Sequence, residues 1–170
     1  MLPTVRSIRR PAASARLAVA AAAALALALA GCGEPADPLA PPDIVYGEDV
    51  CDACGMILSD ERFAAATIVD GDDGPEPRRF DDIGDMFSYH RGHGDLVVHR
   101  WYVHDLDSQS WLDATTAHFV RGEGIRSPMG SGLAAFATAE RAAAYAAEVG
   151  ATVVSFDDLR GPVPPATRHP

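Results

Sequence analysis

A strand-turn-strand-helix pattern that occurs twice is the feature that most constrains how this chain folds. In its first occurrence, an apolar and β-branched run over 64–69 precedes an Asp- and Gly-rich turn over 70–75 and a second short strand. Asp81 or Asp82 then caps a helix that reaches about His90, because aspartate side chains accept hydrogen bonds from the first amides of a helix. The pattern predicts a strand hairpin followed by a helix.

The second occurrence predicts the same order of elements. Together the two ββα-like halves predict an α+β fold, in which a small, mostly antiparallel sheet is covered by helices. Similar capping and turn residues can also imitate a repeat. The expected elements are a strand over 97–103, a turn over 105–108, a strand over 109–112 and a helix from the Asp113 cap to about Val120.

Beyond the two halves, the sequence predicts an irregular loop, a helix and a last strand. The loop over 127–132 contains a proline and four glycine or serine positions and has no regular period. Thr138 begins an alanine-rich helix that ends near Val149, with Gly150 in the position that follows a helix end. The β-branched run over 152–156 predicts the last strand.

Residues 1–31 have the composition of a bacterial lipoprotein signal. Arginines precede an apolar run over 17–30, which is shorter than the ~20 residues that a membrane-spanning helix needs. Leu29-Ala30-Gly31-Cys32 resembles a lipobox, so we expect Cys32 to be the lipidated first residue of the mature protein. An uncleaved N-terminal anchor is the alternative. Both place the protein outside the cytoplasm and on a membrane.

Composition divides the rest of the chain into a tether, one domain and a tail. We expect a Pro/Ala-rich tether over 32–43, a single domain over 44–160 and a loose, proline-rich tail over 161–170. The chain has 14 Lys+Arg residues against 24 Asp+Glu residues, and its formal net charge is −10. This acidity argues against nucleic acid as a partner and against electrostatic binding to anionic lipid, although it also serves plain solubility.

The segment Cys51-Asp52-Ala53-Cys54-Gly55-Met56 brings two thiols and a thioether together. Lipidation would consume Cys32, which leaves one close cysteine pair and no disulfide framework. A Cu(I) site, a zinc site, a redox pair and a structural disulfide are the possible uses of this pair. Met56 favours Cu(I), because a thioether is a soft ligand, unless it is simply a core residue. Zinc usually needs a second ligand pair, and thioredoxin-like pairs follow a strand in a βαβ unit.

Two further methionines and one histidine are candidate ligands from other segments. Met129 lies between a proline and a glycine and belongs to no apolar face, so its thioether is either a soft ligand or a cap on the core. Met86 falls on an amphipathic helix and is more typical of a core residue. His118 comes five residues after Asp113, just as Met86 comes five residues after Asp81. If the halves are true repeats, Met86 and His118 are equivalent and could form a second metal site.

The chain contains no catalytic motif, and we expect a protein that is not an enzyme. There is no Gly-x-Ser-x-Gly, no phosphate-binding glycine loop and no His-Glu-x-x-His. The aspartate pairs at 72–73, 81–82 and 157–158 fall at turns and helix caps, where they are explained without acid–base chemistry.

Five segments, in this order, resemble the NosL family, the copper lipoproteins of nitrous oxide reductase maturation, over roughly 50–159. The resemblance implies two ββα-like halves and one Cu(I) held by cysteine and methionine sulfur. Cys54 and Met56 match the family's sulfur motif, Met129 lies in the matching glycine-rich loop, and Cys51 matches the first cysteine. The segments are Cys51–Ile57, Phe80–Gly84, Trp101–Asp105, Trp111–Ala114 and Pro128–Gly132.

The resemblance also implies a function for the chain. It implies a membrane-anchored metallochaperone that delivers Cu(I) to nitrous oxide reductase outside the cytoplasm, with the help of a membrane ABC-type complex. Two alternatives stay open: a lipid-anchored thiol–disulfide protein that uses Cys51 and Cys54, and a copper chaperone or buffer for another cuproenzyme. A thiol–disulfide protein would need neither Met56 nor Met129, and this distinguishes the first alternative from a copper chaperone.

Overall fold

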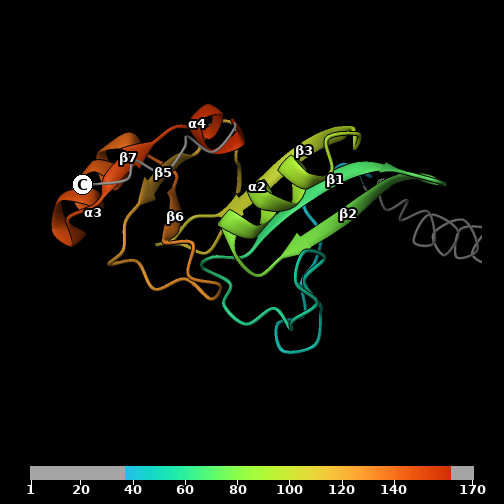
Figure 1. Cartoon of the computed structure of the whole chain (residues 1–170), viewed down its shortest axis with the longest axis horizontal. Helices are drawn as coiled ribbons and strands as arrows, with labels where there is room; N and C mark the ends of the chain where they lie inside the picture. The colour runs from blue at the N-terminus through green and yellow to red at the C-terminus, as the bar shows by residue number, and fades with distance from the viewer. Residues whose placement is uncertain (1–36, 162–170) are drawn as a thin grey trace, which may run out of the picture. The chain divides into compact units, whose positions relative to one another are not determined.

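The computed structural model describes residues 37–161. The expected signal segment, Cys32 and nearly all of the proline-rich tail lie outside the described residues. Strands and helices follow one another along the described chain as shown in Figure 1. Their bounds are β1 (Ala65–Gly71), β2 (Gly74–Phe80), α2 (Ile83–Gly92), β3 (Val98–His104), β4 (Trp111–Asp113), β5 (His118–Arg121), β6 (Leu133–Phe136), α3 (Ala139–Val149), β7 (Thr152–Val154) and α4 (Phe156–Arg160).

Two antiparallel sheets carry the fold, which confirms the expected α+β class. The larger sheet has the strand order β2-β1-β3-β4, and the smaller has the order β6-β5-β7. The sheets meet where Asp105, just after β3, forms a parallel bridge with Ala135 of β6. The Leu106 N–H donates to the Ala135 carbonyl at 2.8 Å and reinforces this junction.

An internal repeat is present, but its second copy starts later than the sequence pattern predicts. In the first copy, β1 pairs with both β2 and β3, and α2 lies between these two partners along the chain. In the second copy, β5 pairs in the same way with β6 and β7, and α3 lies between them. The repeating unit is therefore ββαβ, and β4 is an addition to the first copy.

The prediction of a helix between Asp113 and Val120 is wrong. The Asp113 side chain accepts from the Thr115 N–H at 2.9 Å, but the chain completes only one turn before it enters β5. Phe119 and Val120 are both fully buried, in two different core clusters. The segment is a strand because neighbouring residues of a strand point to opposite faces, so that each can be buried in a different core cluster. Neighbouring residues of a helix do not point in opposite directions.

The other two predicted helix starts are confirmed. The Asp82 side chain accepts from the Gly84 N–H and caps α2, and the Thr138 side chain accepts from the Arg141 N–H and caps α3. Gly150 ends α3 in the left-handed conformation. The predicted last strand is also present as β7, although it is shorter than expected.

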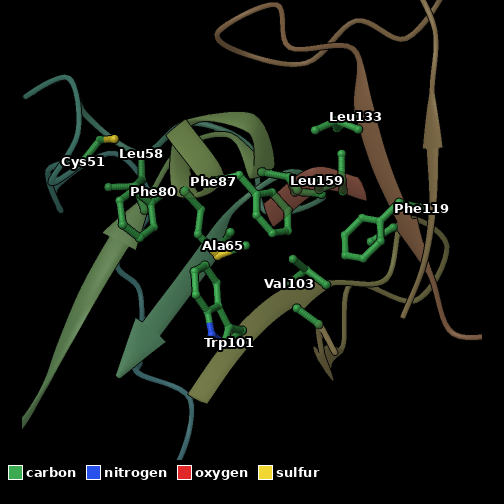
Figure 2. Packing of buried hydrophobic residues seen from close by; sticks show 14 residues of the cluster. Cys51, Leu58, Ala65, Phe80, Phe87, Trp101, Val103, Phe119, Leu133 and Leu159 are labelled. Atoms are coloured by element: carbon green, nitrogen blue, oxygen red, sulfur yellow. The ribbon is translucent and has the colours of Figure 1, made fainter. Parts of the chain in front are cut away.

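The aromatic core joins α2 to both sheets (Figure 2). Phe87 of α2 stacks on Trp101 of β3 with ring centroids 5.8 Å apart. It also meets Phe119 of β5 edge-on at 5.9 Å. Because such pairs add to the free energy gained by burial, the contacts of Phe87 hold α2 against both sheets.

Candidate metal centre

The segment that holds the cysteine pair is a tight loop closed by backbone contacts. Val50 and Ile57 form an antiparallel bridge at its base. The Cys51 N–H donates to the Met56 carbonyl at 2.7 Å, and the Gly55 N–H donates to the Cys51 carbonyl at 2.9 Å. Gly55 has a φ of 72°, which a glycine adopts without the steric cost of a Cβ atom. The loop therefore folds both cysteines into one short turn.

The loop carries one buried thiol and two exposed sulfur atoms. Cys51 is 1% exposed and belongs to the main core cluster, with Leu58 and Phe80 (Figure 2). Cys54 is exposed, and Met56 is 56% exposed. Both cysteines are free thiols. One sulfur is thus fixed by the core, while two others are open to an incoming ion or protein.

Asp85, in the first turn of α2, joins the cysteine pair. Three potential ligand atoms lie within 4.8 Å of one another: the sulfur atoms of Cys51 and Cys54 and a carboxylate oxygen of Asp85. The Oδ2 atom of Asp85 is buried and accepts no hydrogen bond from the part of the chain that the structure describes. These three side chains offer two sulfur donors and one oxygen donor at a single point.

The surroundings favour the protonated forms of Cys54 and Asp85. Burial raises the pKa of the Cys54 thiol, and hydrogen bonding and charge from Cys51 and the charge of Asp85 raise it further, against a hydrogen bond from the Met56 N–H. Burial and the charge of Asp82 raise the pKa of Asp85. A metal ion that binds here therefore displaces protons.

The loop that carries Met129 lies against the same helix start. Asp82 is fully buried and accepts from the Ser127 hydroxyl at 2.6 Å, from the Met129 N–H at 3.1 Å and from the Ser131 hydroxyl. Met129 is 39% exposed, although its backbone is held in this way. Its thioether is therefore carried on a fixed loop and remains accessible.

A groove of about 410 Å³ is lined both by the start of α2 and by the Met129 loop. Asp85 and Gly84 of α2 line one part of it, and Met129 and Ser131 line another. Asp85 thus belongs both to the cysteine cluster and to the groove of Met129. The structure brings Cys51, Cys54 and Asp85 together. It places Met129 on a groove that Asp85 also lines.

Met86 and His118 do not occupy the equivalent positions in the two halves that the sequence pattern suggests. Met86 is fully buried in the core beneath α2. His118 is the first residue of strand β5 and lines a different groove, with Thr115 and Phe156. Because one residue is helical and the other lies in a strand, the equivalence that motivated a second metal site is wrong.

Sequence reasoning missed Asp85 entirely. An aspartate in the first turn of a helix is ordinarily explained by the favourable interaction of its charge with the helix dipole, so it gave no separate signal. Its contact with the cysteine pair depends on where the loop over 51–56 meets α2, and that is a property of the tertiary structure.

The fold and this cluster define a small α+β domain with an accessible, sulfur-rich candidate metal site. The chain belongs to the NosL family, whose sequence profile matches residues 44–163. This match confirms the resemblance found in the sequence motifs.

A curated relative and a solved structure agree with the assignment to this family. The chain is 28% identical over 140 residues to the "Copper-binding lipoprotein NosL" of Stutzerimonas stutzeri, covering 76% of this chain and 72% of the relative. The crystal structure of the copper chaperone NosL from Shewanella denitrificans matches with a TM-score of 0.61. It is 22% identical and covers 72% of this chain and 96% of that protein, which supports the fold.

Within residues 37–161, none of the helices is both long enough and apolar enough to span a bilayer.

Proposed function

We propose that this protein is a Cu(I)-binding metallochaperone. The observation that carries the proposal is the grouping of the Cys51 and Cys54 sulfurs at one point, with exposed thioethers on the same loop and on the adjoining groove. Soft thiolate and thioether ligands select Cu(I) over the hard cations that prefer oxygen. The copper-binding relative from Stutzerimonas stutzeri and the solved copper chaperone support this choice of metal.

The exposure of the sulfur atoms suits transfer rather than storage of the ion. Cys51 is buried and serves as the fixed donor, whereas Cys54, Met56 and Met129 can each be reached from outside. A partner's ligand can therefore replace one exposed donor while Cys51 still holds the ion. The protein contributes ligands and an access route, and no catalytic step is required of it.

We further propose that the chain acts outside the cytoplasm as a lipid-anchored protein, with Cys32 as the lipidated residue. Nitrous oxide reductase is the proposed recipient of the copper, and a membrane ABC-type complex is the proposed helper. The lipobox-like sequence before Cys32 supports the anchor. The description of the Stutzerimonas relative as a lipoprotein also supports it.

A thiol–disulfide function is the competing proposal, and one observation favours it. The two cysteine sulfurs lie close together, and one thiol is exposed while the other is buried, as a reactive pair requires. Such a protein would make no use of a methionine. The two functions therefore differ in their need for Met129.

An anaerobic Cu(I) titration against a competing chelator separates these functions. Wild type, Cys54→Ser and Met129→Leu are compared, each purified from membranes in detergent. A chaperone binds one Cu(I) tightly, loses it with Cys54→Ser and binds it more weakly with Met129→Leu. Weak binding that is indifferent to Met129→Leu would reject the copper site in favour of thiol–disulfide chemistry.

A further inference from the structure

Two consecutive buried carboxylates, Asp81 and Asp82, lie where β2 ends and α2 begins. Asp81 is 2% exposed and Asp82 is 0% exposed. Within the described part of the chain, neither forms an ion pair with an arginine or a histidine. Because a buried carboxylate is costly unless its oxygens are satisfied, the hydrogen bonds that they accept must compensate.

Asp82 accepts most of its hydrogen bonds from the loop that carries Met129. One bond, from the Gly84 N–H at 2.8 Å, is the helix cap. The others come from the Ser127 hydroxyl at 2.6 Å, the Met129 N–H at 3.1 Å, and the hydroxyl and, at 3.5 Å, the N–H of Ser131. One buried carboxylate thus fixes this loop on both sides of the candidate ligand.

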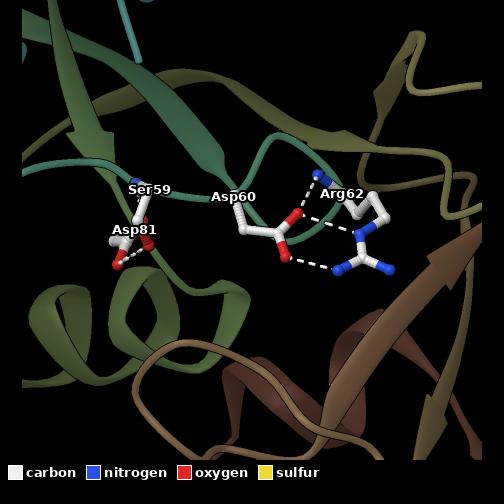
Figure 3. Close-up of polar contacts among 4 residues, drawn as sticks. All are labelled: Ser59, Asp60, Arg62 and Asp81. Atoms are coloured by element: carbon white, nitrogen blue, oxygen red, sulfur yellow. Dashed lines mark hydrogen bonds and ion pairs between the residues drawn. The ribbon is translucent and has the colours of Figure 1, made fainter. Parts of the chain in front are cut away.

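Asp81 holds the chain that leaves the cysteine loop (Figure 3). The Ser59 N–H donates to Asp81 at 2.6 Å, and the Ser59 hydroxyl lies 3.2 Å from both carboxylate oxygens. Ser59 follows Leu58, whose N–H donates to the Asp49 carbonyl at 2.9 Å and so joins the two arms of the cysteine loop. Asp81 therefore fixes the base of this loop.

The Met129 loop approaches the start of α2 so closely that residue 84 has room only for glycine. A Cβ atom added to Gly84 would overlap the side chain of Ser131. Gly84 lies two residues after Asp82, and Asp85 comes next with its contact to the cysteine pair. The beginning of α2 is thus the common support for both segments that carry sulfur.

We propose that Asp81 and Asp82 are the positioning residues of the copper site. Asp81 fixes the cysteine loop and Asp82 fixes the Met129 loop on one helix start, so that both are in place before Cu(I) arrives. This inference rests on the proposed copper function. Its physical benefit is that the loops are already ordered, so that ion binding does not have to compensate for their conformational entropy.

Amide hydrogen exchange of the metal-free protein tests the positioning role directly. Asp82→Asn weakens the acceptor with little change in shape, so it should speed exchange at the Met129 amide and leave the Ser59 amide unchanged. Asp81→Asn should do the reverse. Equal acceleration of both amides by either variant, or no change in either variant, would overturn the assignment.

Cu(I) affinity tests whether positioning matters for the metal. Asp82→Asn should weaken Cu(I) binding by about tenfold, as changes to the supporting partners of metal ligands commonly do. Combined with Met129→Leu, it should cause little further loss, because both changes remove the same sulfur contact. Full additivity in this cycle would show that Asp82 does not act through Met129 and would overturn the proposal.

Three further variants keep the test decisive. Ser127→Ala and Ser59→Ala each remove the hydroxyl that donates to Asp82 or to Asp81, and they should reproduce the two exchange patterns even if an Asn variant fails to fold. Asp113→Asn removes a capping aspartate remote from the site and should change neither readout. If Met129→Leu binds Cu(I) like wild type, the ligand assignment under the proposed function fails, while the exchange experiment still decides the positioning role.

Discussion

Cys51 and Cys54 have opposite surroundings although two residues separate them. Cys51 lies in the core, and Cys54 faces solvent. An oxidant or a partner's ligand therefore reaches Cys54 first, and Cys51 completes whatever reaction begins there. The pair can hold a metal ion only while both sulfurs are reduced, so its redox state governs its use.

Oxidation should abolish copper binding. A mild thiol oxidant takes two electrons and two protons from Cys51 and Cys54 and leaves a disulfide, which has no thiolate for Cu(I). We expect the reduced protein to bind one Cu(I), the oxidised protein to bind none tightly, and a reductant to restore binding. The measurement is a chelator competition on each form, with thiols counted in parallel. Equal affinity of the two forms would contradict the cysteine assignment.

Asp85 should extend the range of metals that the site accepts. Because it adds an oxygen donor to two sulfurs, the cluster suits a borderline divalent ion such as Co²⁺ as well as Cu(I). We expect Co²⁺ to give thiolate-to-metal charge-transfer absorption, and Asp85→Asn to weaken Co²⁺ binding more than Cu(I) binding. Asp95→Asn removes an exposed charge elsewhere and serves as the control. Equal losses for both metals would count against oxygen ligation.

The sequence predicts only part of this site, and the reason is physical. The cysteine pair and Met56 are neighbours along the chain, so their proximity follows from local geometry alone. Met129 could be singled out because its proline- and glycine-rich context fits neither a helix nor a strand. Asp85 could not be identified, because its contact with the cysteines arises from tertiary packing.

At the scale of elements, α2 supports the site through its first turn. It supplies the Asp82 cap, the close approach at Gly84 and the carboxylate of Asp85. Its buried face packs Phe87 between the aromatic rings of both sheets, which fixes the axis of the helix. The position of both sulfur-bearing loops therefore depends on one helix start.

Gly84→Ala should weaken copper binding and lower stability. Alanine is favoured over glycine inside helices by about 1 kcal/mol, but here the added methyl group would push the Ser131 side chain away from α2. We expect a lower melting temperature and weaker Cu(I) binding. Gly92→Ala, at the open end of the same helix, meets nothing within 4 Å and should leave Cu(I) binding unchanged. An unchanged melting temperature and Cu(I) affinity in Gly84→Ala would contradict the close-approach argument.

Capping residues predicted helices correctly in two places and incorrectly in one. Asp82 and Thr138 are each followed by a helix with a single buried face. Asp113 has the same capping chemistry, but the chain beyond it becomes β5, where Phe119 and Val120 are buried on opposite sides. A capping residue reports only on its own segment of the chain. The strand forms here because Phe119 and Val120 are buried in two different core clusters, and the sequence of this segment alone does not show those clusters.

At the scale of the whole molecule, one partly buried and one buried histidine should make stability depend on pH. Burial, together with the charges of His93, Arg78 and Arg160, lowers the pKa of His90 from 6.5 to about 4. Burial also lowers the pKa of His104. Between pH 6.5 and 4 the unfolded chain therefore binds more protons at His90 than the folded chain does.

The folded protein should lose stability as pH falls through this range and change little from His90 above pH 6.5. Urea unfolding at a series of pH values measures this dependence. His90→Gln keeps a polar group near Thr67, which lies 2.9 Å from the ring nitrogen, and should flatten the curve. His118→Gln, at a residue of β5 that does not contribute to this pKa shift, is the matched control. Identical slopes in wild type and His90→Gln would refute the assignment.

The sulfur ligands of the proposed copper site come from segments next to the first copy of the internal repeat and within the second copy. Cys54 lies on the loop that precedes β1 of the first copy, and Met129 lies on the connection between β5 and β6 of the second. An ion bound by both would act as a reversible cross-link that closes a long stretch of chain. Loaded protein would then resist proteolysis and local opening, and it would become looser on delivery. Release of the copper ion would therefore be detectable as an increase in the flexibility of the protein.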